Sequence, residues 1–285
     1  MRFVILGGDT RNITLSQFIA QDGHAVQTIG LGENASDSVA LLDRIQEAIN
    51  RCDYVIGPLP FTIDGENLHM PLSKNNVKLK SLTDIFTGNK VLISGKIPVD
   101  LAEKLSNSGI TVYDYLDRDE MSILNSIPTA EGAIQIAMEE LPITLHRANA
   151  LVFGYGKTGK TLAAKLHALG AVTYVCARKS TDFATCEAYN LYSTDYKTVD
   201  NIIRNMDVIF NTVPARVLDS TRLAKVRPDC LIIDLASKPG GCDFEFAQEN
   251  GIKIIHALSL PGKVAPKTAA NILYKVIAHI IDERS

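Results

Sequence analysis

Two phosphate-binding patterns overlap in one short segment of this chain, residues 154–161, which reads GYGKTGKT. As GxGxxG it predicts the pyrophosphate loop of a dinucleotide-binding fold, and as GxxxxGK[ST] it predicts the P-loop of an ATP- or GTP-binding protein. Both need a strand before the glycines and a helix after them, because the phosphate binds backbone N–H groups at the helix N-terminus. The apolar residues 150–153 supply the strand, and residues 162–166 supply a helix that Gly170 ends.

The residues after the glycines favour the dinucleotide interpretation. The run 171–176 predicts a second strand directly after the helix, and the residue that reads the adenosine ribose follows the glycines by roughly 20 positions. No Asp or Glu stands there to bind a free 2′-hydroxyl; Arg178, Lys179 and Ser180 offer two cations and a hydroxyl instead. These groups predict a 2′-phosphate and hence NADP, with NAD as the alternative. Asp234, at the end of an apolar run, keeps a Walker B aspartate and the P-loop interpretation open.

The composition of the 285 residues is that of an ordinary globular protein, with 46% hydrophobic and 21% charged residues. A net charge of −3 argues against nucleic acid or a membrane surface as the main partner. The longest apolar runs have the length of strands, so no membrane span is expected. The five cysteines form no C-x-x-C pair and fit reduced thiols in the cytoplasm, and no ligand spacing predicts a metal site.

Strand-like and helix-like segments alternate along the chain, which predicts an α/β fold with two Rossmann-like domains, parallel sheets and an interdomain cleft. The expected strands are 3–6, 25–29, 54–56, 91–93, 110–113, 150–153, 171–176, 208–210, 231–234 and 252–255. The expected helices are 14–21, 39–49, 129–140, 162–166 and 268–281. We expect an N-terminal substrate-side domain at 1–125, a connecting helix at 126–147 and a Rossmann NAD(P)-binding domain at 148–265. The C-terminal helix at 266–285 is left open to pack on the first domain.

Ligands of open α/β sheets bind beyond the carboxyl ends of the strands, so the loops there are the expected sites of chemistry. The predicted cofactor-binding residues are Gly154, Tyr155, Gly156, Lys157, Thr158, Gly159, Arg178, Lys179, Ser180, Asn211, Thr212, Val213 and Pro214. Asp9 and Glu131 are candidates for a general base or an orienting partner. Each has a plain alternative: Asp9 as a helix N-cap or the ion-pair partner of Arg11, and Glu131 as a favourable charge in the first turn of a helix. His256, at a strand end, is expected to be structural.

Five motifs along essentially the whole chain resemble the family of dipicolinate synthase A subunits. They are GGDTR at 7–11, LNSIPTAEGA at 124–133, GYGKTG at 154–159, ASKPGG at 236–241 and LPGKVAPKTA at 260–269. The resemblance implies an oxidoreductase subunit of spore-forming bacteria. It would form pyridine-2,6-dicarboxylate (dipicolinate) from a dihydrodipicolinate-level intermediate of the lysine pathway. It also implies a separately encoded, flavoprotein-like B subunit, together with action in the mother-cell cytoplasm during sporulation.

A cyclic dicarboxylate substrate calls for cations and helix N-termini in its site. The expected catalytic residues are Asp9, Glu131 and Lys238. The expected substrate-binding residues are Gly8, Arg11, Pro60, Asn125, Thr129, Ser237, Gly240, Gly241, Lys267 and Thr268, gathered in the interdomain cleft. Two other functions stay open: a P-loop-type ATP-binding protein, and a non-catalytic nucleotide-binding subunit of a flavoprotein complex. The sequence also leaves open whether the chain forms a homo-oligomer.

Overall fold

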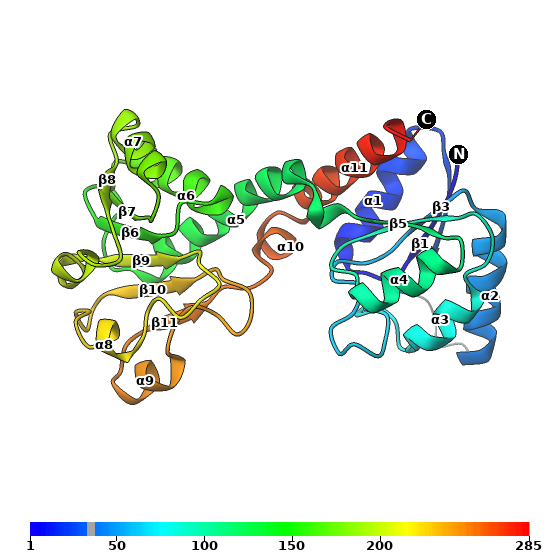
Figure 1. Cartoon of the computed structure of the whole chain (residues 1–285), viewed down its shortest axis with the longest axis horizontal. Coiled ribbons are helices and arrows are strands. Elements are labelled where there is room, and N and C mark those ends of the chain that lie inside the picture. The colour runs from blue at the N-terminus through cyan, green and yellow to red at the C-terminus, as the bar shows by residue number, and fades with distance from the viewer. Residues whose placement is uncertain (33–37, 285) are drawn as a thin grey trace. The chain divides into compact units, whose positions relative to one another are not determined.

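The computed structural model describes residues 1–32 and 38–284. The chain forms two compact units, unit 1 from Met1–Met121 with Ala265–Ser285, and unit 2 from Ser122–Val264 (Figure 1). Each unit contains one parallel β-sheet with helices packed against it. The predicted α/β class with two parallel sheets is therefore confirmed.

The sheet of unit 1 has the strand order β2-β1-β3-β4-β5. Its strands are β1 (Arg2–Leu6), β2 (Ala25–Ile29), β3 (Tyr54–Ile56), β4 (Val91–Ser94) and β5 (Thr111–Asp114). Its helices are α1 (Thr10–Gln21), α2 (Ser38–Arg51), α3 (Leu79–Ile85), α4 (Val99–Asn107), the 3₁₀ turn η1 (Tyr115–Asp117) and α11 (Pro266–Asp282). Val4 and Leu6 of β1 share a core with α2, α3 and α4, and α11 packs on α1. The last helix of the chain, α11, thus belongs to the same unit as the first strand, β1.

The sheet of unit 2 has the strand order β11-β10-β9-β6-β7-β8, all parallel. The strands are β6 (Asn149–Phe153), β7 (Val172–Cys176), β8 (Tyr192–Thr194), β9 (Val208–Asn211), β10 (Leu231–Asp234) and β11 (Ile254–His256). The helical elements that follow α5 (Asp119–Glu140) are α6 (Lys157–Ala168), α7 (Ser180–Ala188), η2 (Val199–Asn201), η3 (Ile203–Asn205), α8 (Ser220–Leu223), α9 (Phe244–Glu249) and α10 (Leu260–Val264). This is the doubly wound order: successive strands are added on one side of β6 as far as β8, and on its other side from β9 onward, so the strand order reverses between β6 and β9. Ligands of such sheets bind at that reversal, beyond the carboxyl strand ends.

The predicted connecting helix at 126–147 is wrong in its bounds. The helix there is α5 (Asp119–Glu140), and two acidic residues in its first turn favour the earlier start. Pro142 explains the earlier end, because the residue before a proline avoids the helical conformation. Pro128 lies inside the helix, where its ring removes one backbone hydrogen bond without ending the helix.

The described part of the chain contains no helix with the length and apolarity needed to cross a bilayer. Within the same residues, no group of three or more His, Cys, Asp or Glu side chains is placed to hold a metal ion. The five cysteines are all buried free thiols.

Candidate functional site

The glycine loop joins β6 to α6 in one tight turn, and each of its three glycines has a structural reason to lack a side chain. Gly154 has a φ of +91°, and a Cβ there would lie 2.6 Å from Thr212 Oγ1. A Cβ on Gly159, in the first turn of α6, would lie 2.2 Å from the Gly154 carbonyl oxygen. A Cβ on Gly156, the N-cap of α6, would meet nothing within 4 Å. Two glycines therefore allow the close packing of the turn, and Gly156 keeps open the space at the helix N-terminus, where a pyrophosphate would bind.

This geometry does not fit a P-loop. In that pattern the four residues between the outer glycines wrap around the phosphates, but α6 already begins at Lys157. The Thr161 hydroxyl donates to the Lys157 carbonyl oxygen (3.1 Å) and lies 2.7 Å from Ser126 Oγ. Asp234, the supposed Walker B aspartate, is fully buried in a hydrogen-bond network of its own.

A pocket of about 600 Å³ lies beyond the carboxyl ends of β6, β7 and β9. Most of the predicted cofactor residues line it: Gly154, Tyr155, Gly156, Lys157, Thr158, Arg178, Lys179, Thr212, Val213 and Pro214. Further residues line it that were not predicted to bind the cofactor: Ser122, Lys160, Ala177, Asp182 and Tyr196. The residues present therefore fit a dinucleotide: a glycine turn with open space, a helix N-terminus and exposed cations meet in one cavity.

Arg178 and Lys179 lie between β7 and α7, and both are exposed. Neither side chain makes a hydrogen bond or ion pair with any other residue that the structure describes, although the Lys179 carbonyl oxygen accepts from the Asp182 and Phe183 backbone N–H groups of α7. Their charges are thus available to a ligand in the pocket. Ser180 is exposed as the first residue of α7, beside the pocket rather than in its lining.

Asn211 lies behind the pocket. Its side chain is fully buried, with Nδ2 donating to Asp234 Oδ1 (2.8 Å) and to the Val213 carbonyl oxygen (3.0 Å). Its Oδ1 accepts a hydrogen bond from the Val213 backbone N–H (3.0 Å). Asn211 therefore positions the loop that lines the pocket, and its direct contact with a cofactor stays a prediction.

Asp234 connects that loop to the following turn, residues 237–241. Its carboxylate accepts from Asn211 Nδ2, from the Ala236 backbone N–H (3.0 Å) and from the Gly241 backbone N–H (2.7 Å). A Cβ on Gly241 would lie 2.1 Å from Asn211 Nδ2, so glycine is needed there. The turn is thereby fixed beside the cofactor loop, with Ser237 and Lys238 exposed on it.

His256 supports the same turn from β11. Its Nε2 lies 2.8 Å from the Ala236 carbonyl oxygen, and its ring lies 5.1 Å from that of Phe244, centroid to centroid. These contacts agree with the structural role expected for it.

In unit 1, Asp9 and Arg11 form an ion pair at the carboxyl end of β1. Asp9 is the N-cap of α1 and accepts from Arg11 Nε (2.9 Å) and from a terminal guanidinium nitrogen of Arg11 (2.7 Å). That second nitrogen also donates to the Leu59 carbonyl oxygen (3.0 Å), next to Pro60. Burial raises the pKa of Asp9, but the hydrogen bonds and charge of Arg11 outweigh it and hold the pKa below its usual range. Both plain alternatives for Asp9 therefore hold in the structure.

His69 and Tyr115 lie near this ion pair, and neither was predicted as a site residue. The His69 carbonyl oxygen accepts from the Gly8 backbone N–H (2.9 Å). Burial lowers the pKa of the His69 imidazole; the charge of Asp9 opposes this change and that of Arg11 adds to it. Burial also raises the pKa of the Tyr115 phenol. No motif marks either residue, because only the fold brings them to Asp9.

The other predicted site residues have structural partners of their own or are exposed. Glu131 forms an ion pair with Lys165 (2.9 Å), and the Thr129 hydroxyl donates to the Asn125 carbonyl oxygen (2.7 Å). Lys267 and Thr268 are exposed in the first turn of α11. The catalytic and substrate-binding roles of all these residues stay predictions.

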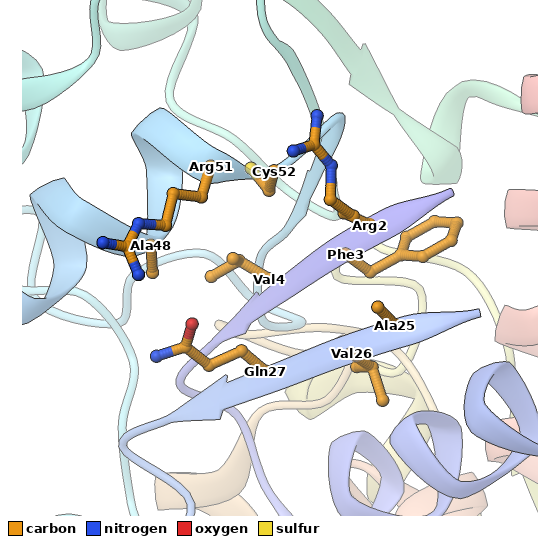
Figure 2. A pocket seen from close by; sticks show the side chains of 9 residues that line it. All are labelled: Arg2, Phe3, Val4, Ala25, Val26, Gln27, Ala48, Arg51 and Cys52. Carbon is orange, nitrogen blue, oxygen red and sulfur yellow. The ribbon is translucent and has the colours of Figure 1, made fainter.

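A second pocket, in unit 1, is less suited to a ligand (Figure 2). It has a volume of about 190 Å³ and lies between the starts of β1 and β2 and the end of α2, away from the carboxyl strand ends. Its two cations are already paired, Arg2 with Asp53 (2.9 Å) and Arg51 with Glu47 (2.8 Å). The glycine-loop pocket of unit 2 is the better candidate site.

Known proteins resemble both halves of the chain. Residues 2–116 match the family described as the N-terminal domain of the dipicolinate synthase A subunit. Residues 129–237 match the NAD-binding domain of D-isomer-specific 2-hydroxyacid dehydrogenases, and this match includes the glycine loop. It supports a nicotinamide dinucleotide as the cofactor and does not favour the P-loop interpretation.

Relatives that match the whole chain are also dipicolinate synthase A subunits. The dipicolinate synthase A subunit of Bacillus subtilis (strain 168) is 31% identical over 286 residues, covering 99% of this chain and 96% of that protein. The crystal structure of the dipicolinate synthase A subunit from Bacillus halodurans is 31% identical, covers 98% of this chain and 97% of that one, and has a TM-score of 0.86. The crystal structure of the Bacillus subtilis protein is 30% identical, with coverages of 99% and 96% and a TM-score of 0.87. The chain therefore belongs to the family of dipicolinate synthase A subunits.

Proposed function

We propose that this chain is an NADP-dependent oxidoreductase subunit that forms pyridine-2,6-dicarboxylate from a dihydrodipicolinate-level intermediate. One observation carries the proposal: the open space at Gly156, above the N-terminus of α6, in a chain 31% identical to a dipicolinate synthase A subunit over 99% of its length. An anion in that space would bind the backbone N–H groups that the first turn of α6 leaves without a helical partner.

NADP rather than NAD is proposed because of the two cations after β7. Arg178 and Lys179 line the pocket, where a 2′-phosphate would accept charge-assisted hydrogen bonds from them. Asp182 is the acidic residue of the pocket lining, and it lies in the first turn of α7, past the usual ribose-reading position at the end of the second strand.

The reaction would remove a hydride and a proton from a partly saturated ring and leave an aromatic product. Bound NADP would supply the hydride acceptor, so the residues of the chain have to orient the ring and accept the proton. Asp9, Glu131 and Lys238 are the proposed catalytic residues. Of these, Asp9 is held ionised by Arg11, Glu131 is paired with Lys165, and Lys238 is exposed on the turn that Asp234 fixes.

A second polypeptide is part of the proposal. The relatives are named as one lettered component of a synthase, which implies at least one further component. We propose that this partner is a flavoprotein-like B subunit and that the setting is the mother cell of a sporulating bacterium. In that arrangement the present chain would hold the nicotinamide nucleotide.

The test is turnover by the purified full chain with NADP and a dihydrodipicolinate-level substrate, followed at the nicotinamide absorbance band. We expect NADPH and dipicolinate to form together, with or without the partner added. Turnover only after the partner is added would show a nucleotide-binding subunit instead. Stabilisation against heat by ATP–Mg but not by NADP would overturn the proposal, since a ligand stabilises only the state that binds it.

A further inference from the structure

Tyr196 connects two parts of the nucleotide pocket. It follows β8, is half-buried and lines the pocket. Its ring lies 6.1 Å from that of Phe153, the last residue of β6 before the glycine loop. Burial raises the pKa of the Tyr196 phenol, while the nearby charge of Arg178 lowers it. One aromatic side chain is therefore close to both the strand of the glycine loop and the cation at the ribose-reading position.

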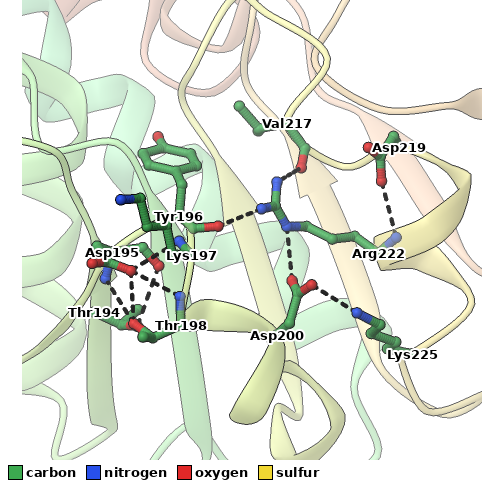
Figure 3. A network of polar contacts seen from close by, with 10 residues as sticks. All are labelled: Thr194, Asp195, Tyr196, Lys197, Thr198, Asp200, Val217, Asp219, Arg222 and Lys225. Atoms are coloured by element: carbon green, nitrogen blue, oxygen red, sulfur yellow. Dashed lines mark hydrogen bonds and ion pairs between the residues drawn. The ribbon is translucent and has the colours of Figure 1, made fainter.

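The backbone on either side of Tyr196 is held by a polar network (Figure 3). Asp195 Oδ1 accepts hydrogen bonds from the backbone N–H groups of Lys197 and Thr198 and from the Thr198 hydroxyl, each at 2.8 Å. Beyond the turn, Val199 is fully buried in the core of unit 2. The loop that carries Tyr196 is thus held by the hydrogen bonds of Asp195 and by the packing of Val199 in the core.

Arg222, on the short helix α8, joins this loop to another one (Figure 3). One terminal guanidinium nitrogen donates to the Tyr196 carbonyl oxygen (2.6 Å), and the other donates to the Val217 carbonyl oxygen (2.7 Å). Val217 lies in the segment that follows the Thr212, Val213 and Pro214 lining of the pocket. The guanidinium group therefore bridges the two loops that bound the pocket.

The guanidinium group itself is held in place. Arg222 Nε donates to Asp200 Oδ1 (2.9 Å), and Lys225 pairs with Asp200 Oδ2 (2.7 Å). The carbon at the centre of the guanidinium group lies 5.9 Å from the centroid of the Tyr196 ring. The side chain is only 18% exposed. A planar fork with donors in three directions is specific to arginine; the single ammonium of lysine cannot bond both carbonyl oxygens and Asp200 in this geometry.

We propose that Arg222 is a positioning residue of the nucleotide site, which holds Tyr196 as the wall against which the adenosine half of the dinucleotide packs. The proposal rests on the proposed function. It assigns the pyrophosphate to the N-terminus of α6, the ribose to the loop after β7, and the wall beside them to Tyr196. Arg222 acts through Tyr196 and does not touch the ligand; it is absent from the pocket lining.

The experiment measures the dissociation constants of NADPH and NADH for the full chain by fluorescence titration, well below the melting temperature. We expect Arg222→Met and Tyr196→Ala each to weaken binding about tenfold, the lower end of what a lost aromatic contact to a base costs. The double variant should bind no more weakly than Tyr196→Ala alone, because Arg222 acts through that ring. Arg222→Lys should resemble Arg222→Met.

Two controls separate positioning from general loosening. Arg204→Met removes an exposed arginine of the same unit. Leu231→Ala opens the core at the amino end of β10, whereas the pocket lies at the carboxyl ends of the strands. Both should keep the affinity of the unmodified protein, although Leu231→Ala melts earlier. If Arg222→Met does not fold, Tyr196→Ala and Arg222→Lys carry the test.

Unchanged affinity in a folded Arg222→Met or Arg222→Lys variant would overturn the inference alone, and so would losses that simply add in the double variant. An unmodified protein that binds neither NADPH nor NADH would overturn the proposed function and this inference with it. An unmodified protein that binds NADH but not NADPH would refute only the proposed cofactor preference, and the same variants would still have to weaken NADH binding.

Discussion

Replacing Gly156 with Val should weaken nucleotide binding by about two orders of magnitude while the fold stays intact. Gly156 has a φ of −77° and a ψ of −167°, a conformation open to Val, and a Cβ there would meet no atom within 4 Å. Gly is better than Val at an N-cap by about 0.5–1 kcal/mol. A stiffer unfolded chain offsets this loss by about 0.4–1 kcal/mol. We therefore expect a free energy of unfolding within about 1 kcal/mol of the unmodified value, and a melting temperature within about 4 °C.

The effect on binding should be much larger. Gly156 makes no side-chain cap, so the Thr158 and Gly159 N–H groups in the first turn of α6 can donate to a pyrophosphate. The two methyl groups of Val would occupy the space that the phosphate needs. Each lost charge-assisted hydrogen bond costs about 1.5–3 kcal/mol, so losing one or two of them costs about 3 kcal/mol. Affinity should fall by about two orders of magnitude.

Two further glycine variants make the assay specific. NADPH affinity is measured by fluorescence titration, and stability by thermal unfolding and circular dichroism. Gly156→Ala should weaken binding less than Gly156→Val, because its single methyl group fills less of the space. Gly159→Ala should lose stability as well, since its Cβ would lie 2.2 Å from the Gly154 carbonyl oxygen. A folded Gly156→Val variant with unchanged nicotinamide-nucleotide affinity would refute the dinucleotide interpretation of the loop.

Three further predictions concern charged groups. Removing both Arg178 and Lys179 by alanine substitution should cost on the order of 2–3 kcal/mol of preference for NADP over NAD, measured as a ratio of dissociation constants; equal affinities of the unmodified protein for the two nucleotides would contradict this. Asp234→Asn should lower the free energy of unfolding by about 3 kcal/mol in a urea titration, because an amide places N–H groups against buried donors; an unchanged midpoint would count against it. The folded pKa of His69 lies below its unfolded value of about 6.5, so the unfolded state binds more protons and stability falls as the pH drops from about 6.5 toward the folded pKa. In the His69→Gln variant the urea midpoint should change less between about pH 7.5 and 5.5 than it does in the unmodified protein. Asp9, whose pKa is lowered, should cause a loss of stability below about pH 4 in both proteins. Identical pH dependence of the midpoint in the two proteins would refute the role of His69.

The strands were largely predictable because most of them are buried on both faces. Such strands read as continuous apolar runs, and the predicted bounds 54–56 and 231–234 agree with β3 and β10. β8 was missed for the opposite reason. It is an edge strand of three residues, and Tyr192 and Ser193 are exposed, so no apolar run marks it.

The glycine loop was predictable because all its demands are local. The positive φ at Gly154, the N-cap at Gly156 and the close approach of Gly159 fall within six residues, so spacing alone identifies them. Tyr196 and Arg222 are 26 positions apart, and neither belongs to a motif. Only the paired strands β6, β7, β8 and β9 bring their segments together.

Asp234 shows why an acidic residue at a strand end is ambiguous in sequence. A Walker B aspartate and a structural aspartate both end a buried strand. Here the carboxylate meets three donors: Asn211 Nδ2 and the backbone N–H groups of Ala236 and Gly241. Asn211 ends β9 and bonds the loop after it, whereas Ala236 and Gly241 belong to the loop after β10, so the cost of burying the carboxylate is offset by hydrogen bonds that fix both loops. A metal ion would have to compete with these donors for the same oxygens, which is a physical reason why this aspartate suits a structural role in a dinucleotide site better than a magnesium-binding role in a P-loop protein.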